Sequence, residues 1–484
     1  MSFLPVMLWS DALIWLLVLV ALGLGWFSRR SPSLCRSWGR LGKNAVAMGA
    51  ATVLCAFLLV GLLDSLHYRL RLPSAPGQQA EAIYSVEVLS VLDYLLKDLR
   101  DGHEKTYSAP FASRLYAKET LETPEGTVRD FPRLKYGGAH LKDESALMGD
   151  VMKRGLYGVF DALLVWMHAF IFLGIGVGIN QRKNIHSLMD VWSSIKRKEI
   201  LGRESRRAIL RGETAIAWRG VLLALGGLLI VFLPLALLSG DYHVFGTDKV
   251  GQDVFYQILK SVRTALVIGL VTTLVTLPVA ISLGILAGYF RGWVDDAIQY
   301  LYTTLSSIPG VLLIAASVLM MQVIIDTHPQ WFSSAAERAD LRLLALCFIL
   351  GLTGWPSLCR LLRGETLKLR ELEYIQAAQA FGVADLAILR RHILPNLMHI
   401  VIIALVMDFS GLVLAEAVLS YVGIGVDPTM ISFGTMINSA RMELSREPAV
   451  WWSLVSAFIF MFTLVLAANL LADAVRDAFD PRMG

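Results

Sequence analysis

Residue types that could perform covalent chemistry are present in this sequence, but their spacing matches none of the usual catalytic patterns. The chain of 484 residues has no G-x-x-x-x-G-K-S/T loop to hold phosphates, no H-E-x-x-H pair to hold zinc and no G-x-S-x-G nucleophile turn. Its nine histidines are scattered, and its four cysteines form no C-x-x-C pair. We therefore expect no catalytic residue, no metal site and no cofactor in this chain.

Two carboxylates lie where a charge is costly. Asp408 stands within the apolar run 397–417, and Glu416 stands near the outer end of the same run. Acids inside a membrane are expensive and are candidates for function by default. For Glu416, an interfacial position that reaches water is the favoured interpretation. For Asp408, a pore-facing or helix–helix hydrogen-bonding role and a substrate role have equal weight.

The composition indicates that the elements positioning these residues lie in a membrane. Hydrophobic residues make up 55% of the chain, charged residues make up 17%, and the mean hydropathy is +0.58. Soluble domains carry about 25% charged residues, and disordered chains are poor in apolar residues, so neither class describes most of this sequence. The net charge of +4 gives no argument for a nucleic-acid partner.

Apolar segments recur along the whole chain and predict about nine transmembrane helices. The runs are continuous rather than alternating, which favours helices over the strands of a membrane barrel. The predicted fold class is therefore an all-α membrane protein. The predicted spans are 12–27, 44–63, 159–179, 218–239, 264–289, 297–325, 341–362, 397–417 and 451–472.

Basic residues between the spans predict the orientation, because Lys and Arg collect on the cytoplasmic side. The segment 29–43 is basic and contains no acid, and the segment 180–217 is also strongly basic. We therefore expect the N-terminus outside, the C-terminus in the cytoplasm and the long segment 64–158 outside. Within that segment, apolar residues at three- and four-residue spacing predict an amphipathic helix over 83–99 that stops at Gly102.

Four parts are expected along the chain. They are two N-terminal transmembrane helices (1–63), an extracytoplasmic domain (64–158), a third helix with a basic cytoplasmic linker (159–217) and a six-helix core (218–484).

The loop 366–396 differs from an ordinary connection between spans. It predicts two short helices joined at Gly382, which can adopt the left-handed conformation that ends a helix. Glu373 suits the start of the first helix, Asp385 suits the start of the second, and Pro395 is expected to stop the second helix and begin the next span. On physical grounds alone, a docking surface for another protein and a hairpin lying on the membrane are comparable interpretations.

This loop resembles the EAA loop of ABC-importer permeases, in which E-A-A-x-x-x-G is followed at fixed spacing by L-P. Gln376-Ala377-Ala378 stands at E-A-A, Gly382 at the glycine and Leu394-Pro395 at L-P. Gln376 departs from the glutamate of the family. The ATPase-coupling residues that the resemblance implies are Glu373, Gln376, Ala377, Ala378, Gly382 and Pro395.

A second segment, 243–253, resembles the outside motif H-P-L-G-T-D-x-x-G-R-D of the oligopeptide/dipeptide subgroup, from which it departs at Val244 and Gln252. The segments 419–425 and 469–482 are also similar to this subgroup, so the resemblance runs from about residue 218 to the end. The residues that match the outside motif are His243, Gly246, Thr247, Asp248, Gly251 and Asp253.

The resemblance implies a type I ABC importer permease core, preceded here by an atypical N-terminal extension. Such a chain is a multi-pass subunit in a bacterial inner membrane, where it would work with a sibling permease and an extracytoplasmic substrate-binding protein. Two ATPase subunits, which bind ATP and magnesium, would drive alternating access through the EAA loop. Peptides are the expected substrate. The alternatives are nickel, opines or peptide-like antibiotics as cargo, or a membrane scaffold or sensor that transports nothing.

Overall fold

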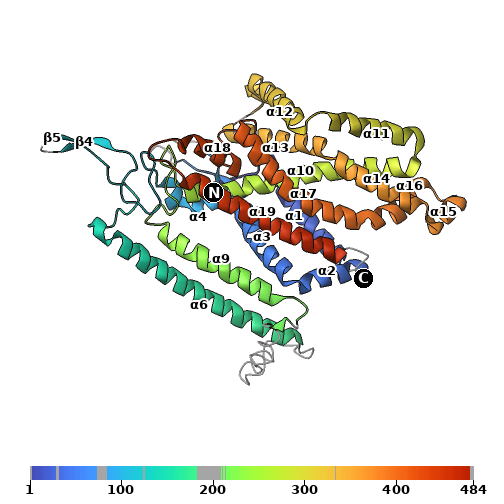
Figure 1. Cartoon of the computed structure of the whole chain (residues 1–484), viewed down its shortest axis with the longest axis horizontal. Helices are drawn as coiled ribbons and strands as arrows, with labels where there is room; N and C mark the ends of the chain where they lie inside the picture. Colours follow the sequence, from blue (N-terminus) through green and yellow to red (C-terminus); the bar gives the residue numbers. More distant parts are fainter. Residues whose placement is uncertain are drawn as a thin grey trace, which may run out of the picture.

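The computed structural model describes residues 3–28, 32–72, 84–123, 126–181, 209, 211–212, 214–332 and 334–479. Arg29 and Arg30 of the first basic segment, most of the basic linker 180–217 and the end of the tail similarity (480–482) lie outside the described residues. Long helices lie side by side along much of the described structure (Figure 1).

The first part of the chain combines helices with short strands. Its elements are β1 (Phe3–Val6), α1 (Trp9–Ser28), α2 (Pro32–Lys43), α3 (Ala45–Asp64), β2 (His67–Leu70), β3 (Leu89–Ser90), α4 (Val91–Leu95), α5 (Lys97–Asp101), β4 (Glu119–Thr123), β5 (Gly126–Asp130), a 3₁₀ turn (Glu144–Ala146) and α6 (Leu147–Gln181).

The second part is helical throughout its described elements. These are α9 (Trp218–Leu238), α10 (Val254–Phe290), α11 (Gly292–Ser307), α12 (Gly310–Thr327), a 3₁₀ turn (Pro329–Trp331), α13 (Ala335–Gly354), α14 (Pro356–Arg370), α15 (Glu373–Ala380), α16 (Asp385–Ile388), a π-helical turn (Leu389–Ile393), α17 (Leu394–Val422), α18 (Phe433–Glu443) and α19 (Trp452–Phe479).

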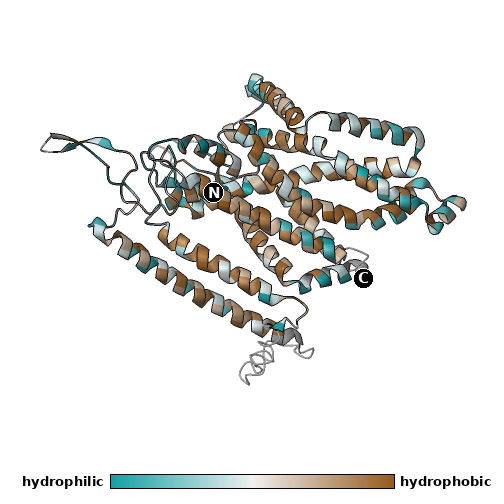
Figure 2. Ribbon diagram, in the orientation of Figure 1, coloured by the Kyte–Doolittle hydropathy of each residue, from teal (hydrophilic) through white to brown (hydrophobic). Residues whose placement is uncertain are grey.

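The described helices agree with a multi-span membrane fold. Seven are long and apolar enough to cross a membrane, and α13 with α14 forms an eighth if this pair, bent by 41°, is counted as one span. Helix α1 contributes a shorter apolar stretch, Trp9–Gly23. The hydropathy colouring shows the apolar bodies of these helices and polar residues at their ends (Figure 2).

Two predicted spans are interrupted in the structure, 341–362 at the bend between α13 and α14 and 297–325 at a proline. The run 297–325 is divided at Pro309 into α11 and α12, and only α12 is long and apolar enough to span. Proline disfavours a helical conformation in the residue before it, and Ile308 accordingly lies in extended backbone with ψ of 132°.

The segment between α3 and α6 also differs from the prediction. No continuous helix covers the described part of 83–99: Leu89 and Ser90 form a strand, and the helix begins only at Val91. Ser90 determines this start, because its hydroxyl accepts from the amide of Asp93 at 3.1 Å while its own amide donates to the Asp93 carboxylate at 2.8 Å. Gly102 ends α5, as predicted.

The small sheets were not expected in an all-α fold. Strand β2 pairs antiparallel with both β1 and β3, and β4 pairs with β5 in a hairpin that projects from one end of the molecule (Figure 1). Because β1 pairs with β2, the N-terminus lies at the same end as the chain that follows α3. The last turns of α19 pack at the opposite end against α2, where Trp38 meets Phe479 edge to face.

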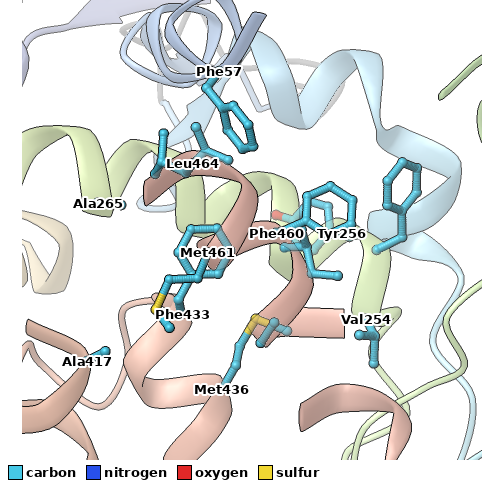
Figure 3. Packing of buried hydrophobic residues seen from close by; sticks show 14 of the residues in the cluster. Phe57, Val254, Tyr256, Ala265, Ala417, Phe433, Met436, Phe460, Met461 and Leu464 are labelled. Atoms are coloured by element: carbon cyan, nitrogen blue, oxygen red, sulfur yellow. The ribbon is translucent and has the colours of Figure 1, made fainter. Parts of the chain in front are cut away.

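The extension and the rest of the chain share one hydrophobic core. Phe57 of α3 lies in the same buried cluster as Ala265 of α10, Ala417 of α17, Phe433 of α18 and Leu464 of α19 (Figure 3). The boundary drawn at residue 218 therefore separates parts of the sequence but not separate cores.

Candidate functional site

The 366–396 loop forms a helix–turn–helix at one end of the molecule (Figure 1). Gly382 has φ of +73°, so the predicted left-handed turn is confirmed. The amide of Val383 donates to the carbonyl of Ala378 at 3.1 Å and closes the end of α15. A β-carbon at Gly382 would meet no atom within 4 Å, so the position needs glycine for its backbone conformation and not for space.

Tyr289, near the end of α10, holds the two short helices together. Its hydroxyl donates to the Asp385 carboxylate at 2.6 Å and accepts from the side-chain amide of Gln379 at 3.1 Å. The sequence analysis missed Tyr289 because it lies some eighty positions before the loop and outside every matched motif. Asp385 does not cap α16, because Ala384 occupies the cap position without a side-chain hydrogen bond, and the carboxylate contacts Tyr289 instead.

The loop leaves an apolar surface uncovered. Phe381 is 88% exposed and Leu386 is 76% exposed, whereas Ile375 and Ile388 are fully buried and anchor the loop. Exposed aromatic and aliphatic side chains that gather on a rigid turn mark an interaction site. The predicted coupling residues have different exposures. Glu373, Gln376, Ala377, Gly382 and Pro395 are exposed, and Ala378 is half-buried.

Pro395 does not stop a helix, contrary to the prediction. The chain stays helical from Asp385 to Val422, and Pro395 lies in the first turn of α17, directly after the π-helical turn Leu389–Ile393. A π turn displaces the backbone groups that a proline cannot bond, so the helix passes the proline without breaking.

The 243–253 motif lies at the opposite end and encloses a buried charge cluster. His243 Nδ1 lies 2.7 Å from Asp253 Oδ2, and its Nε2 lies 3.4 Å from Glu104 Oε1. Burial raises the pKa of Glu104, but the His243 ring and three backbone amides outweigh it and lower that pKa to about 2. Burial lowers the pKa of His243, yet Asp253 and Glu104 raise it to about 9. A protonated histidine therefore bridges two carboxylates.

Glycines of the motif let the extension approach closely. Gly246 and Gly251 both have positive φ, and a β-carbon would lie 2.4 Å from the Ser108 carbonyl oxygen at Gly246 and 1.9 Å from the Glu104 carbonyl oxygen at Gly251. Thr247 Oγ1 accepts from the amide of Ser108 at 2.7 Å and donates to the carbonyl of Thr106 at 2.9 Å.

The aspartates of the motif shape the start of α10. Asp253 accepts from the amides of Phe255 and Tyr256 and caps the helix, while Asp248 accepts from the amides of Val250 and Gln252. The predicted motif residues thus join the segment around Glu104 to α10, except that Asp248 bonds only within the motif and to Gln257 of α10 among the described residues. Glu104 itself was missed, because a lone glutamate carries no pattern that sequence analysis could find.

Two further acids of the extension bind the first turns of α10. Lys260 Nζ lies 2.6 Å from Asp64 Oδ1 and 3.1 Å from Asp93 Oδ1, and the Tyr256 hydroxyl donates to Asp93 at 2.8 Å. These side chains recur about once per helical turn. We call Tyr256, Lys260 and Arg263 the polar ladder of α10.

Arg263 completes this ladder inside the protein. Its Nη2 lies 2.6 Å from Asp11 Oδ1 and donates to Ser10 Oγ at 2.7 Å, and it lies 3.8 Å from Asp340 of α13. His67 Nδ1 approaches the other oxygen of Asp11 at 2.7 Å. Isolated buried charges are costly, so Arg263 and its acids depend on each other.

The intramembrane carboxylates have different surroundings. Glu416 is 2% exposed and does not reach water, so the interfacial interpretation is wrong. It instead accepts the hydroxyls of Ser420 at 2.7 Å and Ser432 at 2.8 Å, which joins α17 to the start of α18. Asp408 is exposed on α17, and among the described residues no hydrogen bond or ion pair reaches it. The expected intrachain hydrogen bond is therefore not observed there.

Comparison with known proteins identifies the family. Residues 280–484 match the family model described as "Binding-protein-dependent transport system inner membrane component". The chain is 34% identical over 241 residues to the glutathione transport system permease protein GsiD of Pectobacterium atrosepticum. The aligned region covers 50% of this chain and 73% of that protein. The chain belongs to this family.

Other relatives of this permease have similar names. Over 242 residues it is 33% identical to the oligopeptide transport system permease protein OppC of Mycobacterium tuberculosis, and this aligned region covers 50% of this chain and 77% of the relative. Over 241 residues it is 27% identical to the dipeptide transport system permease protein DppC of Bacillus subtilis, and this aligned region covers 50% of this chain and 69% of the relative. This permease is a membrane component of a binding-protein-dependent transport system.

Proposed function

We propose that this permease imports peptides, driven by two ATPase subunits that dock on the 366–396 loop. The observation that carries the proposal is the apolar surface of that loop, where Phe381 and Leu386 are exposed on a turn whose inner side chains are fixed. The names of relatives that carry glutathione, oligopeptides and dipeptides support peptides as cargo. ATP and magnesium would be bound by the partner subunits, and a sibling permease would complete the pathway.

The loop is built to pass a displacement on to the spans. Tyr289 ties it to α10 through Asp385 and Gln379, and unbroken helix joins it to α17. A displacement by the ATPases therefore reaches both spans. A ligand shifts a conformational equilibrium only if it binds the two states differently, so the ATPase pair must bind the loop differently when closed and when open.

The proposed orientation has the loop and the C-terminus in the cytoplasm. Arg36, Arg40 and Lys43 of α2 support it, because α2 packs beside the last turns of α19 at the loop end of the molecule. The N-terminus, the 64–158 segment and the 243–253 motif would then face the binding protein outside.

Variants of Phe381 test the docking surface. Phe381→Ser removes exposed apolar area without touching the buried anchors, and we expect loss of ATPase co-purification and of peptide uptake in proteoliposomes holding the whole transporter. Phe381→Leu keeps an apolar side chain and should retain both. ATPase association and uptake by Phe381→Ser at wild-type levels would refute docking at this surface.

Gly382 provides an independent test of the same loop. Valine fits poorly at positive φ, and the left-handed conformation costs a side-chain-bearing residue roughly 1–2 kcal/mol, so Gly382→Val should misplace the docking surface. Gly382→Asn should be milder, because asparagine tolerates this conformation. The measurement is ATP hydrolysis stimulated by peptide-loaded binding protein, and equal stimulation in both variants would contradict the coupling role.

A further inference from the structure

The carboxylate of Asp408 lies at the middle of α17. It stands 14 residues after Leu394 and 14 residues before Val422, the two ends of the helix. At 1.5 Å per residue, it is about 21 Å from either end. The predicted span 397–417, about 32 Å long as a helix, is close to the roughly 30 Å hydrocarbon layer of a bilayer and has Asp408 near its middle.

The side of α17 that carries Asp408 is open in this chain. We call it the open face; its members are Asp408, Gly411, Leu414, Val418 and Val422. Their spacing of three, three, four and four residues places them on one side of a helix. The opposite side, including Val413 and Glu416, is buried against the neighbouring helices.

A lipid environment does not fit the carboxylate of Asp408. A charge at the bilayer centre is costly, and intramembrane carboxylates face water, a partner group or a substrate path. No described Lys, Arg or His side chain pairs with Asp408. By contrast, the buried Arg263 has Asp11 and Asp340 as partners. Gly411, one turn further along, has no atom within 4 Å of where a β-carbon would be, so there is free space beside the carboxylate.

We propose that the open face of α17 lines the translocation path and that Asp408 selects a cationic group of the cargo, the ammonium of a peptide. The ammonium part of this inference rests on the proposed function. A peptide with a free N-terminus carries one such ammonium at neutral pH whatever its side chains, because the α-amino pKa is about 7.7–8.0. A single carboxylate at mid-path therefore recognises a feature that peptides of different sequence share.

Thiol chemistry at Gly411 tests the charge of this face without any cargo. In a transporter lacking the native cysteines, Gly411→Cys places a thiol one turn from Asp408, in open space. We expect it to react with water-borne methanethiosulfonates, the cationic ethyltrimethylammonium reagent reacting about tenfold faster than the anionic ethylsulfonate reagent at low salt. Adding Asp408→Asn should bring the two rates close together. Leu223→Cys, on an exposed face of α9, serves as the lipid-facing control and should not react.

The proposal would be overturned if the Gly411→Cys thiol did not react, or if Asp408→Asn left the ratio of the two reaction rates unchanged.

Uptake by proteoliposomes holding the whole transporter tests the role of the cargo. Asp408→Asn should lower uptake of a free-amine tripeptide about tenfold, and Asp408→Glu should restore most of it, with ATPase association unchanged. Normal uptake by Asp408→Asn would overturn the selection of the ammonium. If the wild type takes up no peptide, the proposed function fails, whereas the rate ratio still decides whether Asp408 faces the path.

Discussion

At the residue scale, the charge state of His243 affects the contact between the motif and the extension. It lies between Asp253 and Glu104 in a buried site, and those carboxylates raise its pKa from 6.5 to about 9. The interactions that raise the pKa of His243 stabilise the folded protein fully at a pH below 6.5, the pKa of histidine in the unfolded chain. This stabilisation is lost as the pH rises through about 9, the pKa in the folded protein. Glu104, with a pKa lowered from 4.5 to about 2, contributes above 4.5 and loses its contribution as the pH falls through about 2.

The expected result is a contact that is strongest between about pH 4.5 and 6.5 and weakens by at most about 3 kcal/mol towards pH 9. Thermal unfolding of the purified transporter across this range measures it. His243→Gln should lower stability at pH 6 and flatten the decline above it. His399→Gln is the control, because that half-buried ring forms, within the described part of the chain, a hydrogen bond to the backbone carbonyl of Asn396 and no ion pair. If His243→Gln shows the same decline as the wild type, the ion cluster does not cause it.

At the element scale, α10 holds the extension to the rest of the protein. Its polar ladder meets Asp93, Asp64 and Asp11, which come from α4, α3 and α1. Removing one partner of a buried ion pair leaves the other charge uncompensated and costs about 3–5 kcal/mol. We therefore expect Arg263→Gln to reduce the thermal stability of the purified protein strongly.

The pair Arg100 and Asp101 supplies the matched control for this prediction. It is a surface pair between sequence neighbours at 2.9 Å, and such pairs contribute about 0–1 kcal/mol. Arg100→Gln should therefore unfold close to the wild-type temperature. Equal, small effects of both variants would mean that the ladder does not anchor the extension.

Several elements could be predicted from the sequence because their signals are local. The continuous apolar runs of α3, α9 and α19 are sufficient to predict these helices. The turn at Gly382 follows from the left-handed conformation that glycine adopts easily. The proline that breaks the helix at Pro309 is also a local signal. The prediction nevertheless ran one span through it, because apolar residues lie on both sides.

Other features depend on distant partners and could not be predicted in this way. Strand β1 forms because β2 lies beside it, sixty residues later in the chain, and Glu104 becomes important only when the 243–253 motif folds over it. Asp11 and Arg263 are 252 positions apart and meet only in the folded core. No sequence pattern joins such residues, so pairwise spacing could not find them.

At the scale of the whole molecule, the two ends have different proposed partners. The 366–396 loop and the end of α19 lie at one end, and the motif, β1 and the β4–β5 hairpin lie at the other (Figure 1). Single cysteines at Lys118 and Lys368, in a background lacking the native cysteines, test which end is outside. An impermeant maleimide should label Lys118→Cys in cells with a permeabilised outer membrane, and Lys368→Cys only after lysis. The reverse pattern would invert the proposed topology.

The unbroken helix from Asp385 to Val422 has a mechanical consequence. Its 38 residues make a lever about 57 Å long, with the proposed docking loop at one tip and, in the proposed orientation, the outer surface of the membrane near the other. Asp408 divides it into arms of about 35 Å and 21 Å. If the fulcrum lies near Asp408, a swing of about 5° moves the loop tip about 3 Å and the outer tip about 2 Å in the opposite sense. A small stroke at the ATPase end would then open one mouth of the path while narrowing the other, with the carboxylate almost stationary at the pivot.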